Sequence, residues 1–168
     1  MQTSSLVPLR TAYQRLLEGI CFVLMVALAV IVVVGVGYRK FGASLVWYDE
    51  IASVLLAWVT YYGAALAALR GGHIAVHSLV DTLPPRWRLA MAVFAEVCVI
   101  GFFVLLAWMG FAVLDVLATD TLVSLPEVSV MYTQSVIPIG AVMFIIAELL
   151  RLPEVFALAT TKRVAGDL

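Results

Sequence analysis

Residues 16–37 read LLEGICFVLMVALAVIVVVGVG, a run of 22 positions in which Glu18 is the single charged residue. A helix needs roughly 20 mainly apolar residues to cross the hydrocarbon core of a bilayer, because each residue adds about 1.5 Å. The run therefore predicts a membrane-spanning helix. It is longer than the ~7–15-residue apolar core of a cleaved signal peptide, and no small-residue cleavage site follows it near Tyr38, so we expect it to remain as an anchor.

Three further apolar stretches can also span a bilayer, and they cover about Ile51–Leu69, Leu89–Leu117 and Val130–Leu150. The chain is 64% hydrophobic and 12% charged, whereas a soluble domain is about half apolar and about a quarter charged. One soluble core cannot bury this excess. The sequence therefore predicts an all-α integral membrane protein, with four transmembrane helices in a single domain over residues 1–168. The third stretch is the longest, so we expect it to tilt or to project beyond the bilayer.

The basic residues predict the orientation of these helices. Eight of the ten lie in the N-terminal arm, in the connection between the second and third stretches, or in the C-terminal tail. By the positive-inside rule, this distribution places both termini in the cytoplasm. The exceptions, Arg39 and Lys40, share a short loop with Asp49 and Glu50. Aromatic side chains are expected at the membrane interfaces: Trp47, Tyr48 and Tyr132 outside, and Trp87 inside.

The connection between the second and third stretches has a helical pattern of its own. Apolar residues recur there at i, i+3, i+4 and i+7, at Val76, Leu79, Val80 and Leu83. This pattern predicts a short interfacial helix along the cytoplasmic surface, ending at Pro84-Pro85. A bent loop packed against the spans would suit the same residues.

Acidic residues within membrane spans are costly, so each needs a partner or a function. Glu18 follows Arg15 by three residues and Glu148 precedes Arg151 by three, so each can pair with its neighbour or reach water. Asp115 lies close enough to the outer end of its stretch to reach the interface. We expect structural roles for these three acids.

Glu96 differs, because it lies about two turns inside the third stretch and the nearest base along the chain, Arg88, is two turns away. It therefore faces a polar partner on another helix, or it binds a proton or cation itself. The second reading would suit an alternative function, a small autonomous exporter that uses Glu96 as its proton carrier.

Motifs for catalysis are absent from the sequence, which has no nucleophile elbow, phosphate-binding glycine loop, CxxC or HExxH. The two histidines, His73 and His77, share a helical face, but no third and fourth metal ligand accompany them, and haem would need histidines on facing helices. Cys21 and Cys98 lie inside apolar runs as small hydrophobic residues. With a net charge of −1, we expect no enzyme, metal, cofactor or nucleic-acid partner.

The second stretch carries small residues at helical spacing. Gly63, Ala67 and Gly71 recur every four residues, and a parallel line contains Thr60, Ala64, Ala68 and Gly72. Small residues at this spacing let another helix approach closely in lipid, where packing rather than hydrophobic burial drives association. The spacing is compatible with packing inside the chain or against a partner protein.

The second stretch, its flanks and the beginning of the fourth stretch resemble a known family. The residues that carry the resemblance are Glu50, Trp58, Gly63-Ala64-Ala65 and Arg70-x-x-His73-Ile74-x-Val76, followed by Pro126, Tyr132 and Ile137-Pro138-Ile139-Gly140. Over about residues 45–145 they are similar to the small membrane subunit (DctQ-like) of tripartite ATP-independent periplasmic (TRAP) transporters. One departure is His77, where the family often has an acidic residue.

The resemblance implies a non-catalytic transporter subunit in the bacterial inner membrane. In such systems a soluble periplasmic solute-binding protein captures an organic acid and delivers it to a large membrane transport subunit, which moves the solute inward. The small subunit binds the large one, braces it among the membrane lipids, and is a candidate to help dock the solute-binding protein.

The matched residues then have structural or partner-binding roles. Glu50 is expected to cap the second helix, or to pair with Arg39, Lys40 or a basic group of the large subunit. Trp58 lies about 12 Å deeper along the same helix, so we expect it to fill a gap between helices rather than to anchor an interface.

The remaining matched residues lie near helix ends. Arg70 and His73 are expected to complement the cytoplasmic end of the second helix and to bind lipid phosphate. Pro138, next to Gly140 in the motif, is expected to loosen the fourth helix near its outer end, where a missing hydrogen bond is least costly.

Overall fold

The computed structural model describes residues 6–71 and 84–160, and the regular elements in these ranges are helices. Four of them are long: α1 (Leu6–Lys40), α2 (Tyr48–Leu69), α4 (Pro85–Leu117) and α6 (Val136–Thr160). A short helix, α5 (Val130–Gln134), comes directly before α6. The four long helices are long and apolar enough to cross a membrane, which confirms the predicted all-α membrane architecture. The predicted interfacial helix at 76–83 lies outside the described residues.

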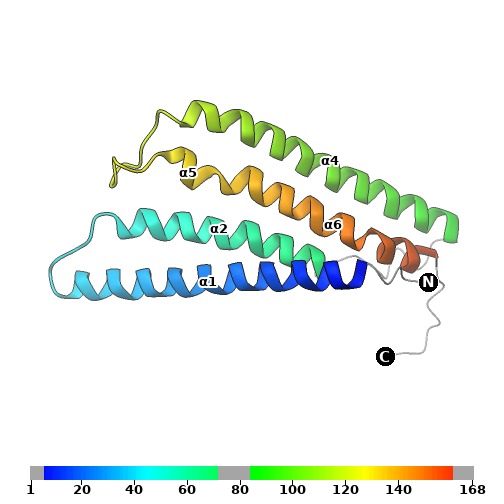
Figure 1. The fold of residues 1–168 in the computed structure, drawn as a ribbon, viewed down its shortest axis with the longest axis horizontal. Helices are drawn as coiled ribbons and strands as arrows, with labels where there is room; N and C mark the ends of the chain where they lie inside the picture. The colour runs from blue at the N-terminus through cyan, green and yellow to red at the C-terminus, as the bar shows by residue number, and fades with distance from the viewer. Residues whose placement is uncertain (1–5, 72–83, 161–168) are drawn as a thin grey trace.

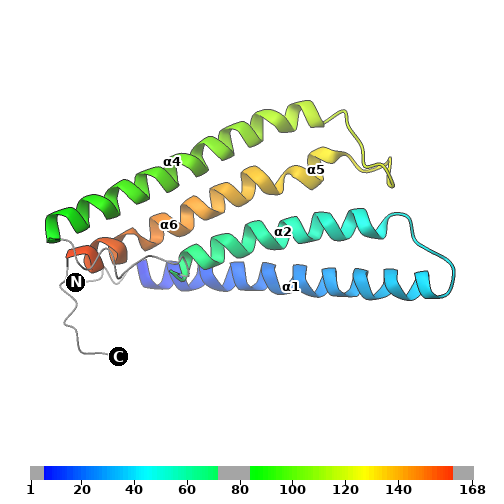
Figure 2. The same cartoon turned by 180° about the vertical axis from the view of Figure 1, so that it is seen from behind.

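The long helices lie side by side in an open row rather than in a closed bundle (Figure 1). α1 packs against α2, α2 against α6, and α6 against α4. The same order is visible from behind (Figure 2), with α1 and α4 at opposite edges of the row. The two edge helices therefore each have one substantial neighbour, and much of their apolar surface is left uncovered by the chain itself.

The contact between α1 and α2 is a regular seam. Buried or half-buried positions on α1 recur every three or four residues, at Leu17, Cys21, Leu24, Leu28, Ile31 and Gly35. This spacing is typical of helices that cross at a shallow angle. Gly35 lets the ring of Tyr48 lie directly on α1, where a Cβ would overlap that ring. Tyr48 is therefore buried against α1, and its expected level at the outer interface stays a prediction.

The best-packed part of the row lies toward the end where α1 begins and α6 ends. Its core combines Leu17 of α1, Leu69 of α2 and Phe144 of α6, all nearly or fully buried. Phe103 of α4 stacks on Phe144, with ring centroids 3.7 Å apart and ring planes 10° from parallel. This stack attaches the edge helix α4 to the core.

Two helices are longer than a bilayer requires. α1 has 35 residues and α4 has 33, so each extends for roughly 50 Å at about 1.5 Å per residue. The hydrocarbon core is about 30 Å thick, so both helices must tilt or project beyond it. The sequence predicted such tilt or projection for the third span only. The same holds for α1, because this helix begins at Leu6, ten residues before the predicted first span.

Candidate partner-binding surface

The most exposed face of α2 carries mainly small residues, which we call the α2 stripe: Ser53, Leu56, Thr60, Gly63 and Ala67. Successive members are three or four residues apart, so they share one side of the helix. The first three are exposed, and a Cβ built on Gly63 would meet no neighbouring atom within 4 Å. Among the described residues, therefore, no neighbouring helix packs onto Gly63.

The other small residues predicted for the second span include several that face the rest of the chain. Ala68 is fully buried, and Ala64 packs beside it at the core. Gly71 has a positive φ of 71°, and a Cβ there would lie 3.2 Å from the guanidinium of Arg151. Gly72 lies outside the described residues. The small-residue surface is thus divided: Ala64 and Ala68 pack within the chain, whereas no described helix packs onto Gly63 of the α2 stripe.

α6 has an exposed line of larger side chains. They are 36% to 51% exposed and recur at helical spacing, at Ile139, Val142, Ile146, Leu149 and Phe156. Gly140 does not belong to this line, because it faces α2. A Cβ on Gly140 would lie 2.8 Å from the Cβ of Tyr61, so the glycine permits close contact between α6 and α2.

Glu50 ties the beginning of α2 to the loop between α4 and α5. One carboxylate oxygen accepts a hydrogen bond from the backbone N–H of Val123 at 3.1 Å. The other accepts from the backbone N–H of Ser124 at 2.9 Å and also from the Ser124 hydroxyl. Glu50 therefore binds the facing loop, whereas a pair with Arg39 or Lys40 was one of the roles expected for it beside helix capping and a bridge to the large subunit.

Trp58 lies beside a break in the fourth span. Its indole Nε1 donates a hydrogen bond to the carbonyl of Thr133 at 2.9 Å. The sequence predicted one continuous span over Val130–Leu150, but the helix is interrupted between α5 and α6 at Ser135. Pro138 explains the interruption, because it has no N–H to donate to a carbonyl four residues earlier. Trp58 thus fills the space between α2 and this break.

Arg70 joins the end of α2 to α1. Its Nη2 lies 2.5 Å from Oε1 of Glu18, and the same oxygen accepts a hydrogen bond from Gln14 at 2.7 Å. The sequence suggested Arg15 as the partner of Glu18. Arg70 takes that role because it is brought beside Glu18 by the packing of α1 on α2, which local sequence spacing does not reveal.

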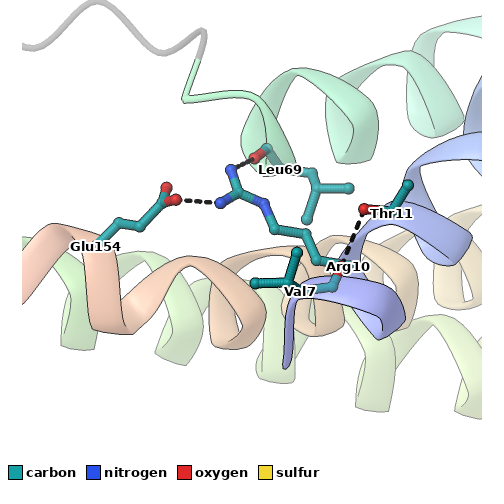
Figure 3. Close-up of polar contacts among 5 residues, drawn as sticks. All are labelled: Val7, Arg10, Thr11, Leu69 and Glu154. Atoms are coloured by element: carbon teal, nitrogen blue, oxygen red, sulfur yellow. Dashed lines mark hydrogen bonds and ion pairs between the residues drawn. The ribbon is translucent and has the colours of Figure 1, made fainter. Parts of the chain in front are cut away.

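Arg10 forms a second polar tie at this end of the row (Figure 3). It pairs with Glu154 of α6 and donates to the carbonyl of Leu69, the last residue of α2, at 3.0 Å. The last carbonyls of a helix lack intrahelical partners, so this bond satisfies one of them. One turn further along α1, Tyr13 donates to the carbonyl of Met143 on α6 at 2.7 Å. Sequence analysis missed both residues, because their partners lie 59 to 144 positions away.

Glu96 lies in the seam between α4 and α6. The half-buried positions of α4 recur every three or four residues, at Leu89, Ala92, Glu96, Val99 and Phe103. Glu148 of α6 is 3% exposed. Nη1 of Arg151 lies 3.9 Å from the Glu148 carboxylate. Because Glu96 lies in the contact between two helices of the same chain, its location does not support the alternative function of an autonomous exporter that carries protons on Glu96.

The last residues to place are the potential metal ligands, including the histidines. Within residues 6–71 and 84–160, the structure places no group of three or more potential metal ligands together. His73 lies outside the described residues, so its expected position at the end of α2 remains a prediction.

Comparison with known proteins identifies the family. The model of the family described as tripartite ATP-independent periplasmic transporters, DctQ component, matches residues 28–158. No curated protein matches the chain. The matched range covers well over half of the chain and includes all of α2, α4 and α5, most of α6 and the last third of α1. This multi-pass membrane protein therefore belongs to the DctQ component family of TRAP transporters, as the residues around Glu50, Trp58 and Pro138 predicted.

Proposed function

We propose that this chain is the non-catalytic small subunit of a TRAP transporter that imports an organic acid across the bacterial inner membrane, and that it braces the large transport subunit. Family membership supports its place in such a transporter. The observation that supports the bracing role is the open row of helices, in which no other described helix packs onto Gly63 of the α2 stripe.

The α2 stripe suits a protein partner better than lipid. Lipid tails are as apolar as leucine, so helices in a membrane associate through close packing and hydrogen bonds rather than hydrophobic burial. Gly63 and Ala67 would let a partner helix approach the backbone of α2, and the Thr60 hydroxyl lies on the same side. We assign this surface to a helix of the large subunit, with the larger side chains of α6 facing lipid.

The proposed orientation has both termini in the cytoplasm, in keeping with the distribution of basic residues. The loop that Glu50 holds then faces the periplasm. It exposes Asp120, Glu127 and the side chain of Val123, which is 94% exposed. These residues are available to a transiently bound solute-binding protein.

The substitution Gly63→Leu tests the bracing role. The chain is coexpressed with its large subunit, which carries the affinity tag, and the amount that co-purifies is measured in mild detergent. A leucine at a close helix contact costs about 1–3 kcal/mol through overpacking, so association should fall by roughly 5- to 150-fold.

Gly19→Leu is the matched control. Gly19 also has no neighbouring atom within 4 Å of a built Cβ, but it lies on the edge helix α1. We expect this variant to co-purify as the unchanged chain does. Equal co-purification of the Gly63 and Gly19 variants would remove the α2 stripe as the contact, and transport of an organic acid by the chain alone in liposomes would contradict the bracing role altogether.

A further inference from the structure

A shallow groove lies on the outward side of α4, close to the end where this helix meets the loop to α5. Four residues line this α4 groove, Trp108, Phe111, Ala112 and Asp115, and its volume is about 400 Å³. Their spacing of i, i+3, i+4 and i+7 places them on one face of the helix. All four are exposed, and α6 is the main neighbour of α4 among the described helices. The groove therefore opens toward the membrane rather than toward the row.

Asp115 has no counter-ion in the described part of the chain. Its carboxylate forms no ion pair or hydrogen bond with the residues that the structure describes. No lysine, arginine or histidine occurs between Arg88 and Arg151, and Arg88 is about 40 Å away along α4. Arg39 and Lys40 are at the end of α1, on the opposite edge of the row (Figure 2). Because a carboxylate on the outward face of a membrane helix is costly to leave alone, it calls for a cation from outside the chain.

The α4 groove crosses the boundary between lipid headgroups and acyl chains. Asp115 is two residues before the end of α4 at Leu117, and the loop that follows has an exposed acid, Asp120. Such a loop needs water, so Asp115 lies near the level of the headgroups. Phe111 and Trp108 are then about 6 Å and about 10 Å deeper along the helix. A headgroup layer is about 5–8 Å thick, so these rings lie at the level of the glycerol and the upper acyl chains.

The chemistry of the groove suits a ligand with a cationic head and an apolar body. An ionised carboxylate accepts charge-assisted hydrogen bonds from a primary ammonium. It would repel an anionic headgroup, and so would the exposed acids Asp120 and Glu127 of the adjoining loop. A single carboxylate is too little for a divalent cation such as Ca²⁺, which takes about six to eight oxygen ligands.

The α4 groove also suits a lipid better than a protein helix. Trp108 is 73% exposed and Phe111 is 52% exposed, and both rings are bulky, whereas helices that pack closely in a membrane rely on small residues at the contact. Tryptophan is enriched at membrane interfaces, because its ring has an apolar body and one polar N–H.

We propose that the α4 groove binds a phospholipid whose headgroup carries a primary ammonium. The ammonium donates hydrogen bonds to the Asp115 carboxylate, and the glycerol and upper acyl chains lie against Phe111 and Trp108. The bilayer thereby supplies the counter-ion that the described residues do not provide. This site requires only that α4 spans a membrane, so it does not depend on the bracing role or on the transported solute.

Photocrosslinking of the purified full chain in lipid nanodiscs tests the proposal. Two probes are compared, a phosphatidylethanolamine and a phosphatidylglycerol, each with the same photoreactive group near the glycerol end of one acyl chain. Mass spectrometry then measures the labelling of the peptide that contains Trp108 and Phe111. In the unchanged chain the phosphatidylethanolamine probe should label this peptide about 3- to 10-fold more, the range expected for a charge-assisted hydrogen bond at a partly solvated site.

Asp115→Asn keeps the shape of the side chain and removes its charge, so the two probes should label the peptide equally. Asp120→Asn is the matched control, because Asp120 is an exposed acid outside the groove, and it should preserve the difference. Asp115→Ser, which also removes the charge, replaces the asparagine variant if that variant does not fold.

Equal labelling by the two probes in the unchanged chain, or a difference that survives in Asp115→Asn, overturns the proposal. The complex with the large subunit separates a lipid from a protein partner. The difference between the probes should persist in this complex. If assembly removes the labelling and Asp115→Asn lowers co-purification, the groove holds a basic side chain of that subunit, and the lipid site is wrong.

Discussion

The indole N–H of Trp58 donates to the carbonyl oxygen of Thr133 at 2.9 Å, which joins α2 to the point where the fourth span breaks. The interruption between α5 and α6 disturbs the helical hydrogen bonds around Pro138, and the lipid core offers no water to replace them. Trp58 therefore does more than fill space between helices. Its side chain on α2 donates a hydrogen bond to a carbonyl beside the break between α5 and α6.

Replacing Trp58 with phenylalanine keeps a ring in the gap but removes the N–H donor. We expect the free energy of unfolding to fall by about 1–2 kcal/mol, since a buried carbonyl loses its partner. Unfolding by sodium dodecyl sulfate in mixed micelles measures this change. Trp108→Phe is the control, because Trp108 is 73% exposed on α4 and should tolerate the change. Equal stability of the two variants would argue against the Trp58 bond.

Glu50→Gln should loosen the loop between α4 and α5. A glutamine side chain has one acceptor oxygen, so it cannot accept from Val123 and from Ser124 as both carboxylate oxygens do. Loss of about 1–2 kcal/mol of local stability corresponds to roughly 5- to 30-fold faster amide hydrogen exchange at these two residues. Exchange should remain unchanged in Glu127→Gln. Slow exchange in the Glu50 variant would show that the backbone holds the loop by itself.

Gly140→Ala should weaken the contact between α6 and α2. The new methyl group would lie 2.8 Å from the Cβ of Tyr61, which is fixed to the α2 backbone and cannot rotate away. Overpacking of this kind costs about 1–3 kcal/mol. Gly101→Ala provides the contrast, because a Cβ at this position would meet no neighbouring atom within 4 Å. This substitution should stabilise α4 by up to about 1 kcal/mol, since alanine has the higher helix propensity. In denaturant titrations, the midpoint of unfolding should therefore fall for Gly140→Ala and rise for Gly101→Ala.

Arg10→Met retains the aliphatic part of the side chain and removes the guanidinium. The Leu69 carbonyl and the Glu154 carboxylate both lose a partner, so we expect about 1 kcal/mol of destabilisation, moderated by the partial exposure of the pair. Arg15→Met, an exposed change on the same helix, should have little effect. The thermal midpoints of the two variants in detergent provide the comparison, and identical midpoints would mean that the tie shown in Figure 3 contributes nothing.

The sequence predicted the number and approximate position of the spans because membrane thickness imposes a minimum length of apolar helix. The four long helices confirm that part of the prediction. Composition alone could not show that the helices form an open row. A lipid-facing surface and a protein-facing surface are both apolar, so hydropathy does not indicate which helix packs against which.

The candidate site was only partly visible in the sequence, for a related reason. Gly63, Trp58 and Glu50 stood out through residue type and spacing, but their partners are set by tertiary packing. The hydrogen bonds that Trp58 donates and Glu50 accepts span 73 to 75 positions, and periodicity reveals no such contacts. Local pairing rules likewise suggested Arg15 for Glu18, although Arg70 is 52 positions away and makes the closer pair.

The order of helices in the row differs from their order along the chain, because α6 lies between α2 and α4. During synthesis α4 enters the bilayer while its main neighbour has not yet left the ribosome. Until α6 packs beside it, this newly inserted helix lacks the neighbour that partly buries Glu96. A chain truncated before α6 should therefore be an early target for membrane proteases.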